Sequence, residues 1–147
     1  MVLRWFGILG LIVAGGWTSV AIADHELDGR DIANGKLLYA DNCAACHGEN
    51  LEGQENWQRP GPDGVLPAPP HDASGHTWHH ANGLLVDYTL LGGQAALEKR
   101  GLADFKSGMP AFEGILSEDE VLDVLSYIRS TWPKRIQDIH RGRNPQH

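Results

Sequence analysis

Cysteine and methionine are scarce in this chain of 147 residues, and each scarcity limits its chemistry. Only Cys43 and Cys46 carry thiols, so a structural zinc site built on this pair would lack the second cysteine pair that usually completes it. Met1 and Met109 are the only methionines. No internal repeat is present, and no segment alternates polar and apolar residues convincingly, so the sequence predicts no sheet.

Basic side chains are also in the minority, with 12 lysines and arginines against 19 acidic residues and a formal net charge of −7. This balance argues against a nucleic-acid partner. It favours electropositive partners, with simple solubility as the alternative explanation.

The long apolar run of the chain lies at its N-terminus. Arg4 precedes the apolar segment Trp5 to Val13, and Ala21 to Ala23 forms an A-x-A cleavage site. We therefore predict that residues 1–23 are a signal peptide, with a retained membrane anchor as the alternative. Residues 24–133 are then one domain, and residues 134–147 are expected to be a basic, loosely ordered tail.

Residues Cys43 to His47 form the sequence C-x-x-C-H, which is typical of covalent haem attachment. Two thiols at this spacing can form thioethers with the haem vinyl groups, and the adjacent histidine can bind the iron. On a helical turn these residues share one side. A dithiol redox pair would require a βαβ context, and a plain disulfide would leave the histidine unexplained. The motif therefore predicts one haem c, bound through Cys43 and Cys46 with His47 on the iron. Such a haem is attached outside the cytoplasm in bacteria, which agrees with export.

The rest of the chain is predicted to be helical. The first helix is expected from about Asp28 to Asn42, with Asp28 or Asp31 as its N-cap. Gly35 lies on the stripe that leads to the haem motif, where a close helix crossing would explain a glycine. Shorter helices are expected at 84–91 and 94–100, after a long loop at 48–80.

The last helix has the strongest local signals in the chain. Ser117 and Glu120 have the spacing of a capping box. Val121, Leu125, Ile128 and Trp132 follow at helical spacing, and Pro133 stops the helix.

The sixth iron position is predicted to be filled by Met109, which lies in a loop between Gly108 and Pro110. Methionine and histidine together occupy both axial positions, so the iron exchanges electrons without binding substrate. A core-filling methionine is the alternative. The stretch from His71 to His80 offers competing ligands for a bis-histidine haem, or imidazoles for copper or zinc. Hydrogen bonding to loop backbone or haem propionates is the simpler explanation of these histidines.

Gly35, Tyr39 and the C-x-x-C-H motif, together with Met109 to Phe112 and Val124 to Ile128, resemble the class I c-type cytochromes. The small bacterial monohaem members are the most similar group. The resemblance implies an all-α cytochrome c fold in which Gly35 and Tyr39 cross the Leu125 to Ile128 turn. It also implies a proline carbonyl that accepts the proximal imidazole N–H, for which Pro69 is the candidate. Trp57 and Trp78 are candidates to reach the haem propionates, with packing as the alternative.

The expected function is one-electron transfer between redox proteins in a periplasmic or membrane-associated respiratory chain, not enzymatic catalysis. The protein would be soluble in the periplasm or anchored to the inner membrane through its N-terminus. Two alternatives stay open at this point. One is a haem enzyme or sensor with an open distal site, and the other is a copper-binding module that uses His71 to His80.

Overall fold

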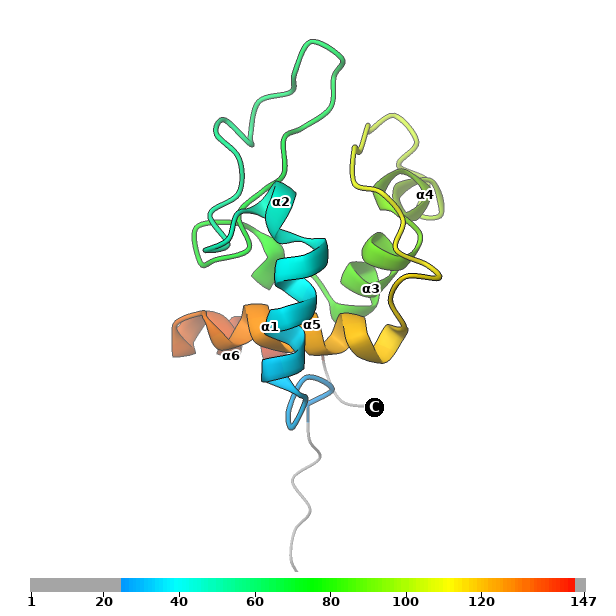
Figure 1. The fold of residues 1–147 in the computed structure, drawn as a ribbon. Helices are drawn as coiled ribbons and strands as arrows, with labels where there is room; N and C mark the ends of the chain where they lie inside the picture. Colours follow the sequence, from blue (N-terminus) through cyan, green and yellow to red (C-terminus); the bar gives the residue numbers. More distant parts are fainter. Residues whose placement is uncertain (1–24, 145–147) are drawn as a thin grey trace, which may run out of the picture.

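Residues 25–144 are described by a computed structural model, and helices account for its regular structure. In chain order the elements are α1 (Ile32–Asn42), α2 (Ala44–His47), the 3-10 turn η1 (Thr77–His79), α3 (Asn82–Leu90), α4 (Gly93–Glu98), α5 (Glu118–Ser130) and α6 (Lys134–Arg143). Within this part of the chain the only β pairing is an isolated bridge between Glu113 and Leu116. The predicted all-α fold is therefore confirmed (Figure 1).

The predicted signal peptide, residues 1–23, lies outside the described residues. Among the helices between residues 25 and 144, none is both long and apolar enough to cross a membrane.

Both long helices begin at side chains that satisfy free backbone N–H groups. Asp31 caps α1, because its Oδ1 accepts a hydrogen bond of 2.9 Å from the N–H of Asn34. Ser117 caps α5, and Glu120 bonds back to the Ser117 N–H at 2.8 Å, which completes the predicted capping box. Of the two candidate caps for the first helix, the structure selects Asp31.

Helix α1 stands across α5, and the two backbones touch at Gly35 (Figure 1). A methyl group added at Gly35 would lie 2.1 Å from the carbonyl oxygen of Asp123 and 3.0 Å from the nitrogen of Val124. The predicted close crossing is present, but Gly35 meets Asp123 and Val124, the two residues immediately before the expected segment. Tyr39 packs further along, in a cluster with Val124 and Ile128.

The buried face of α5 supplies the centre of the molecule. One apolar cluster joins α5 to Val86 of α3 and to the segment before α1, through Leu27, Leu116, Val121, Leu122 and Leu125. The second cluster lies next to the haem motif and consists of Tyr39, Leu51, Val124, Ile128 and Trp132. The apolar face predicted from the sequence of α5 therefore contributes to both clusters of the core. Helix α1, which leads into the haem motif, packs directly on this face.

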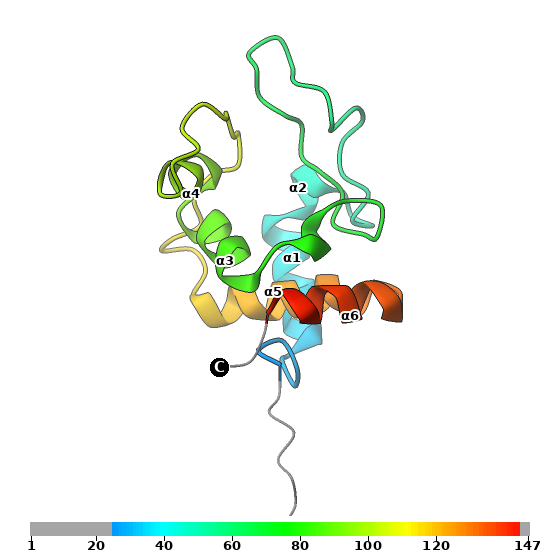
Figure 2. The same cartoon turned by 180° about the vertical axis from the view of Figure 1, so that it is seen from behind.

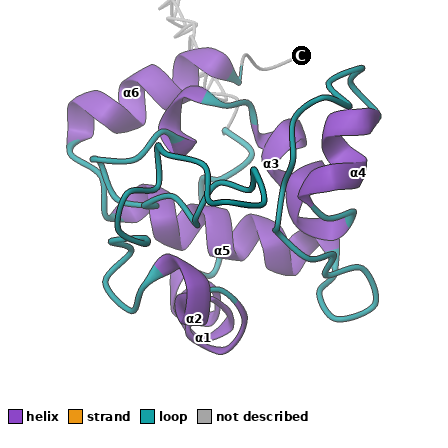
Figure 3. Ribbon diagram, turned by 90° about the horizontal axis from the view of Figure 1, so that it is seen from above, coloured by secondary structure: helices purple, strands orange, loops and turns teal. Residues whose placement is uncertain are grey.

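The expected loose tail is wrong for residues 134–143, because they form helix α6 (Figures 2 and 3), which packs against η1. Pro133 ends one helix and provides the N-cap position of the next. His140 is only 1% exposed and packs on the indole of Trp132, with ring centroids 5.2 Å apart. Burial of the face of α6 that carries His140 fixes the position of residues 134–143, although their polar composition does not indicate it.

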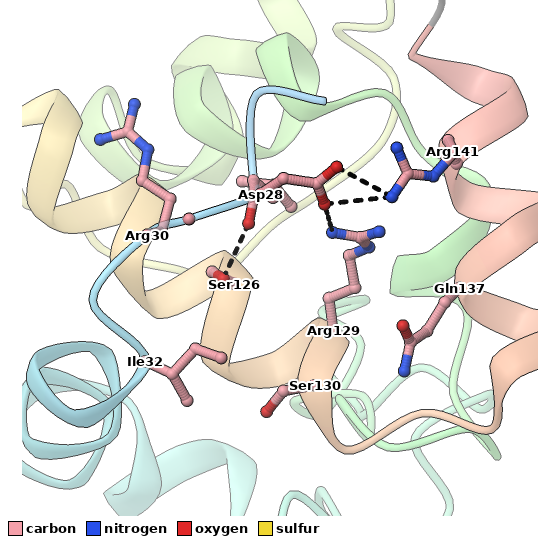
Figure 4. A pocket seen from close by; sticks show the side chains of 10 residues that line it. Asp28, Arg30, Ile32, Ser126, Arg129, Ser130, Gln137 and Arg141 are labelled. Carbon is pink, nitrogen blue, oxygen red and sulfur yellow. Dashed lines mark hydrogen bonds and ion pairs between the residues drawn. The ribbon is translucent and has the colours of Figure 1, made fainter. Parts of the chain in front are cut away.

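Asp28 joins the start of the described chain to α5 and α6. Its carboxylate pairs with Arg129 at 2.8 Å and with Arg141 at 2.9 Å, and we call these three residues the clasp. The two guanidinium groups, acting against partial burial, lower the pKa of Asp28 to about 2. The clasp borders a hollow of about 350 Å³ that is also lined by Ser126 and Gln137 (Figure 4).

Candidate functional site

The C-x-x-C-H motif begins where α1 ends and occupies one further helical turn. The N–H of Cys43 donates to the carbonyl of Tyr39 at 2.9 Å, and the N–H of His47 donates to the carbonyl of Cys43 at 2.9 Å. The two cysteines are not joined to each other by a disulfide; Cys43 is partly buried and Cys46 is exposed. Because Tyr39 is anchored in the core, the motif is attached to a rigid helix.

The thiol chemistry disfavours the redox-pair alternative. Burial, reinforced by the neighbouring Cys46, raises the pKa of the Cys43 thiol to about 11. Catalytic dithiols need a lowered pKa, because the thiolate is the reactive form. The Cys43 thiol is therefore protonated near neutral pH, which argues against a redox nucleophile.

His47 is buried, and one of its two ring nitrogens already has a partner. Its Nδ1 lies 2.8 Å from the carbonyl oxygen of Pro69, the contact that the family resemblance implied for this proline. A carbonyl can only accept, so Nδ1 carries the proton and Nε2 is left with its lone pair. Burial lowers the pKa of His47, while the Pro69 carbonyl acts in the opposite direction. The imidazole is therefore neutral and oriented, as a metal ligand must be.

His71 packs face to face on His47, a contact that sequence reasoning missed. The two ring centroids are 3.9 Å apart with an interplanar angle of 16°. Two rings stacked in this way cannot both direct a nitrogen at an iron atom between them, so this arrangement disfavours His71 as the distal ligand. Burial, together with the charges of His47 and His76, lowers the pKa of His71 well below its usual value. His71 is therefore uncharged near neutral pH and packs against one face of the His47 ring.

Leu51 holds the loop that carries His71 in place. Its carbonyl accepts the N–H of His71 at 2.8 Å, and its side chain is 4% exposed within the core cluster. Its φ of 68° is left-handed, a conformation that costs free energy for a leucine and persists only where the surroundings enforce it. A left-handed φ is typical of glycine, so a leucine at this position gives no sequence signal of the turn.

The loop of Met109 is fixed to α3 and α4 on one side. The N–H of Gly93 donates to the Met109 carbonyl at 3.0 Å, and the N–H of Met109 donates to Ser107 Oγ at 3.3 Å. Ser107 in turn accepts from the Tyr88 hydroxyl at 2.9 Å. A Cβ at Gly93 would lie 1.9 Å from Ser107 Oγ, so only glycine permits this contact. The methionine backbone is therefore held without depending on its own side chain.

The two tryptophans occupy different environments. Trp78 Nε1 donates to the carbonyl of Gly75 at 2.9 Å, which favours the packing alternative over a propionate contact. Trp57 stacks on His76, with ring centroids 5.2 Å apart and an interplanar angle of 13°.

The copper alternative finds no support in the geometry. Among residues 25–144, no group of three or more His, Cys, Asp or Glu side chains is arranged to hold a metal ion. His76, His79 and His80 instead pack edge to face on one another. Burial, and then the neighbouring His79 and His76, lower the pKa of His80 to about 4.

The residues fit a covalent haem on three counts. Two free thiols share a helical turn, the adjacent histidine keeps one ring nitrogen available, and a lone thioether sits on a fixed loop. In Figure 1 the turn α2, which carries His47, and the yellow segment before α5, which carries Met109, both rise above α5, on the left and on the right.

Comparison with known proteins gives a family match and a similar protein. The family described as "Cytochrome c" matches residues 32–132. The chain is 30% identical over 104 residues to "Cytochrome c6" of Diacronema lutheri, which covers 68% of this chain and 95% of that protein. No solved structure matches the chain significantly.

Proposed function

The chain belongs to the cytochrome c family, and we propose that it transfers single electrons with its iron held by His47 and Met109. One haem c is bound covalently through Cys43 and Cys46. When bound, the haem supplies a metal that changes oxidation state by one electron. The observation that carries the proposal is the 2.8 Å contact between His47 Nδ1 and the Pro69 carbonyl.

The proximal contact fixes which nitrogen faces the metal. With Nδ1–H donated to Pro69, Nε2 is the nitrogen free to bind, and the ring cannot turn without losing that hydrogen bond. Hydrogen bonding also raises the basicity of the imidazole as a ligand. Stacking of His71 against one ring face restricts the same rotation.

The distal side supports a ligand that stays in place in both oxidation states. A thioether is a neutral ligand, so its retention depends on the position of its backbone. The bonds from Gly93 and Ser107 hold that backbone independently of the metal. With His47 and Met109 both bound to the iron, the protein would have no open site for substrate, which favours a carrier over an enzyme or sensor.

The proposal also includes the cellular compartment, the class of cytochrome and the kind of redox partner. The apolar segment Trp5 to Val13 and the A-x-A sequence support export to a bacterial periplasm, with the protein either released or anchored to the inner membrane. A class I bacterial cytochrome in that compartment would take electrons from one redox protein and pass them to another. The acidic composition favours basic partners in weak, charge-steered encounters.

Carbon monoxide binding tests the distal ligand. The reduced protein should show no spectral change when carbon monoxide is added, while Met109→Ala should bind the gas readily. His76→Ala serves as the control, because it removes the competing imidazole, and it should behave like the unmodified protein. Rapid binding by the unmodified protein would refute the proposed function as an electron carrier. Binding by His76→Ala alone would show that His76, and not Met109, is the sixth ligand.

A further inference from the structure

Residues 54–68 form a closed loop whose two ends are hydrogen bonded to each other. The N–H of Gln54 donates to the Ala68 carbonyl at 2.9 Å, and Gln54 Oε1 accepts the N–H of Ala68 at 2.9 Å. Near the tip, the N–H of Gly61 donates to the Val65 carbonyl at 2.8 Å. Compact loops of this kind, with adjacent ends and internal bonds, are often functional. We call residues 54–68 the strap.

The tip of the strap touches the chain immediately before Met109. Lys106 Nζ donates to the carbonyl oxygen of Asp63 at 3.0 Å. A methyl group added at Gly108 would lie 3.0 Å from Val65 Cγ1, so this side chain packs against the backbone beside the methionine. These contacts join segments 43 residues apart in the sequence. They are separate from the bonds that Gly93 and Ser107 make to Met109.

The base of the strap touches the proximal side of the site. Gly53, with φ of 69°, lies so close to the next segment that an added Cβ would be 2.4 Å from the nitrogen of Pro70 and 2.7 Å from the carbonyl carbon of Pro69. The strap thus begins and ends next to the carbonyl that orients His47. Trp57, on the strap, is further braced by its stack on His76. One loop therefore contacts the supports of both axial residues.

We propose that the strap keeps Met109 in place, with Val65 and Lys106 as positioning residues that hold the Met109 loop closed. This inference rests on the proposed ligation by His47 and Met109. The tip contacts involve the side chain of Lys106, which is exposed, and one branched side chain, so they can break without unfolding the core. When they break, the segment before Met109 loses its outer support and the sulfur can move away. The strap therefore sets how often the sixth position opens.

Ligand exchange in the oxidised haem protein measures this opening. Imidazole is added as the competing ligand, and its rate of binding is followed in the visible spectrum for Val65→Ala and Lys106→Ala. A hydrogen bond from a charged donor changes an equilibrium by about tenfold and burial of one methyl group by about fourfold, so we expect exchange to be roughly three to ten times faster in Lys106→Ala and in Val65→Ala. The reduction potential should shift in the same variants, because the sulfur is less well held.

Two control variants match these changes. Leu66→Ala removes an exposed apolar neighbour of Val65, and Lys99→Ala removes a lysine that pairs with Asp87 instead of the strap. Both should exchange ligand at the unmodified rate. The midpoint of urea unfolding should be almost equal in all four variants, which separates positioning of the methionine from general stability.

The outcomes distinguish the strap from the ligation itself. Faster exchange in Val65→Ala and Lys106→Ala alone supports the strap. Slow exchange in every variant, with fast exchange only in Met109→Ala, overturns the strap and leaves the ligation standing. An unmodified protein that exchanges as fast as Met109→Ala overturns both proposals.

Discussion

Replacing Gly35 with alanine tests the contact on which the whole fold depends. An added methyl carbon would lie 2.1 Å from the Asp123 carbonyl oxygen, whereas ordinary contacts begin at 3.4 Å. The obstructing atoms belong to the backbone of α5, which cannot make room by a change of rotamer as a side chain can. The two helices must therefore separate by about 1.3 Å at this point, or the variant must distort its backbone.

The expected cost follows from two opposing effects. Alanine is favoured over glycine inside a helix by roughly 0.5–1 kcal/mol, because glycine loses more backbone freedom on folding. Overpacking of a rigid contact costs about 1–3 kcal/mol, and a clash with backbone belongs at or above the upper end. We therefore expect Gly35→Ala to lower the free energy of unfolding by about 2 kcal/mol. Separation of the helices would also loosen Tyr39 beneath the haem motif.

Gly83 provides the matched control, because it lies in helix α3 and an added Cβ would meet nothing within 4 Å. Gly83→Ala should raise the free energy of unfolding by roughly 0.5–1 kcal/mol. Urea unfolding of the haem protein, followed by far-ultraviolet circular dichroism, measures both variants. Opposite signs are the expected result. Equal or greater stability of Gly35→Ala would show that the crossing of α1 and α5 is not as tight as described.

Three further changes have defined outcomes. Ser117→Ala removes the N-cap of α5 and should cost about 1 kcal/mol in urea unfolding; a loss below a few tenths would contradict the capping box. Asp28→Asn leaves the mostly buried Arg129 without its counter-ion and should cost about 2 kcal/mol, whereas Asp138→Asn, which breaks an exposed pair with Lys134, should cost less than about 1 kcal/mol. Burial, with the charges of His25 and Arg129, lowers the pKa of His140 from 6.5 to about 4. The unfolded chain then binds more protons between these values, so stability present above pH 6.5 should fall by about 2–3 kcal/mol towards pH 4, and His140→Asn should flatten that loss.

Local signals account for most of what the sequence could predict. The capping box at Ser117 and the apolar spacing of Val121, Leu125 and Ile128 depend on neighbours along one helix, and the structure contains them as expected. The C-x-x-C-H motif is local in the same sense, since all its groups lie within one turn. The closeness of Gly35 to another helix could be inferred because glycine is otherwise unfavourable there.

Features that depend on partners distant in sequence were not predictable. Helix α6 was expected to be a loose tail because half of its residues are lysine, arginine or aspartate, although Ile136 and His140 have the i, i+4 spacing of a buried face. The stack of His71 on His47 requires a loop path that no local pattern specifies. The contact between Val65 and Gly108 in the Met109 loop also joins residues that are distant in sequence. In each case the sequence supplies the residue, and only the fold supplies its neighbour.

The crossing of α1 and α5 also sets an order of events in the making of the protein. Asn34 on α1 bonds to Asp123 on α5 at 3.0 Å, and these residues are 89 positions apart. Synthesis proceeds from the N-terminus, so Cys43 and Cys46 exist well before the helix that will cover their own helix. An isolated helix of 11 residues is marginal in water, so α1 stays pliable during this interval. Until α5 docks, the two thiols therefore lie at the end of a pliable segment, and docking of α5 at Gly35 and Asn34 fixes that segment in place.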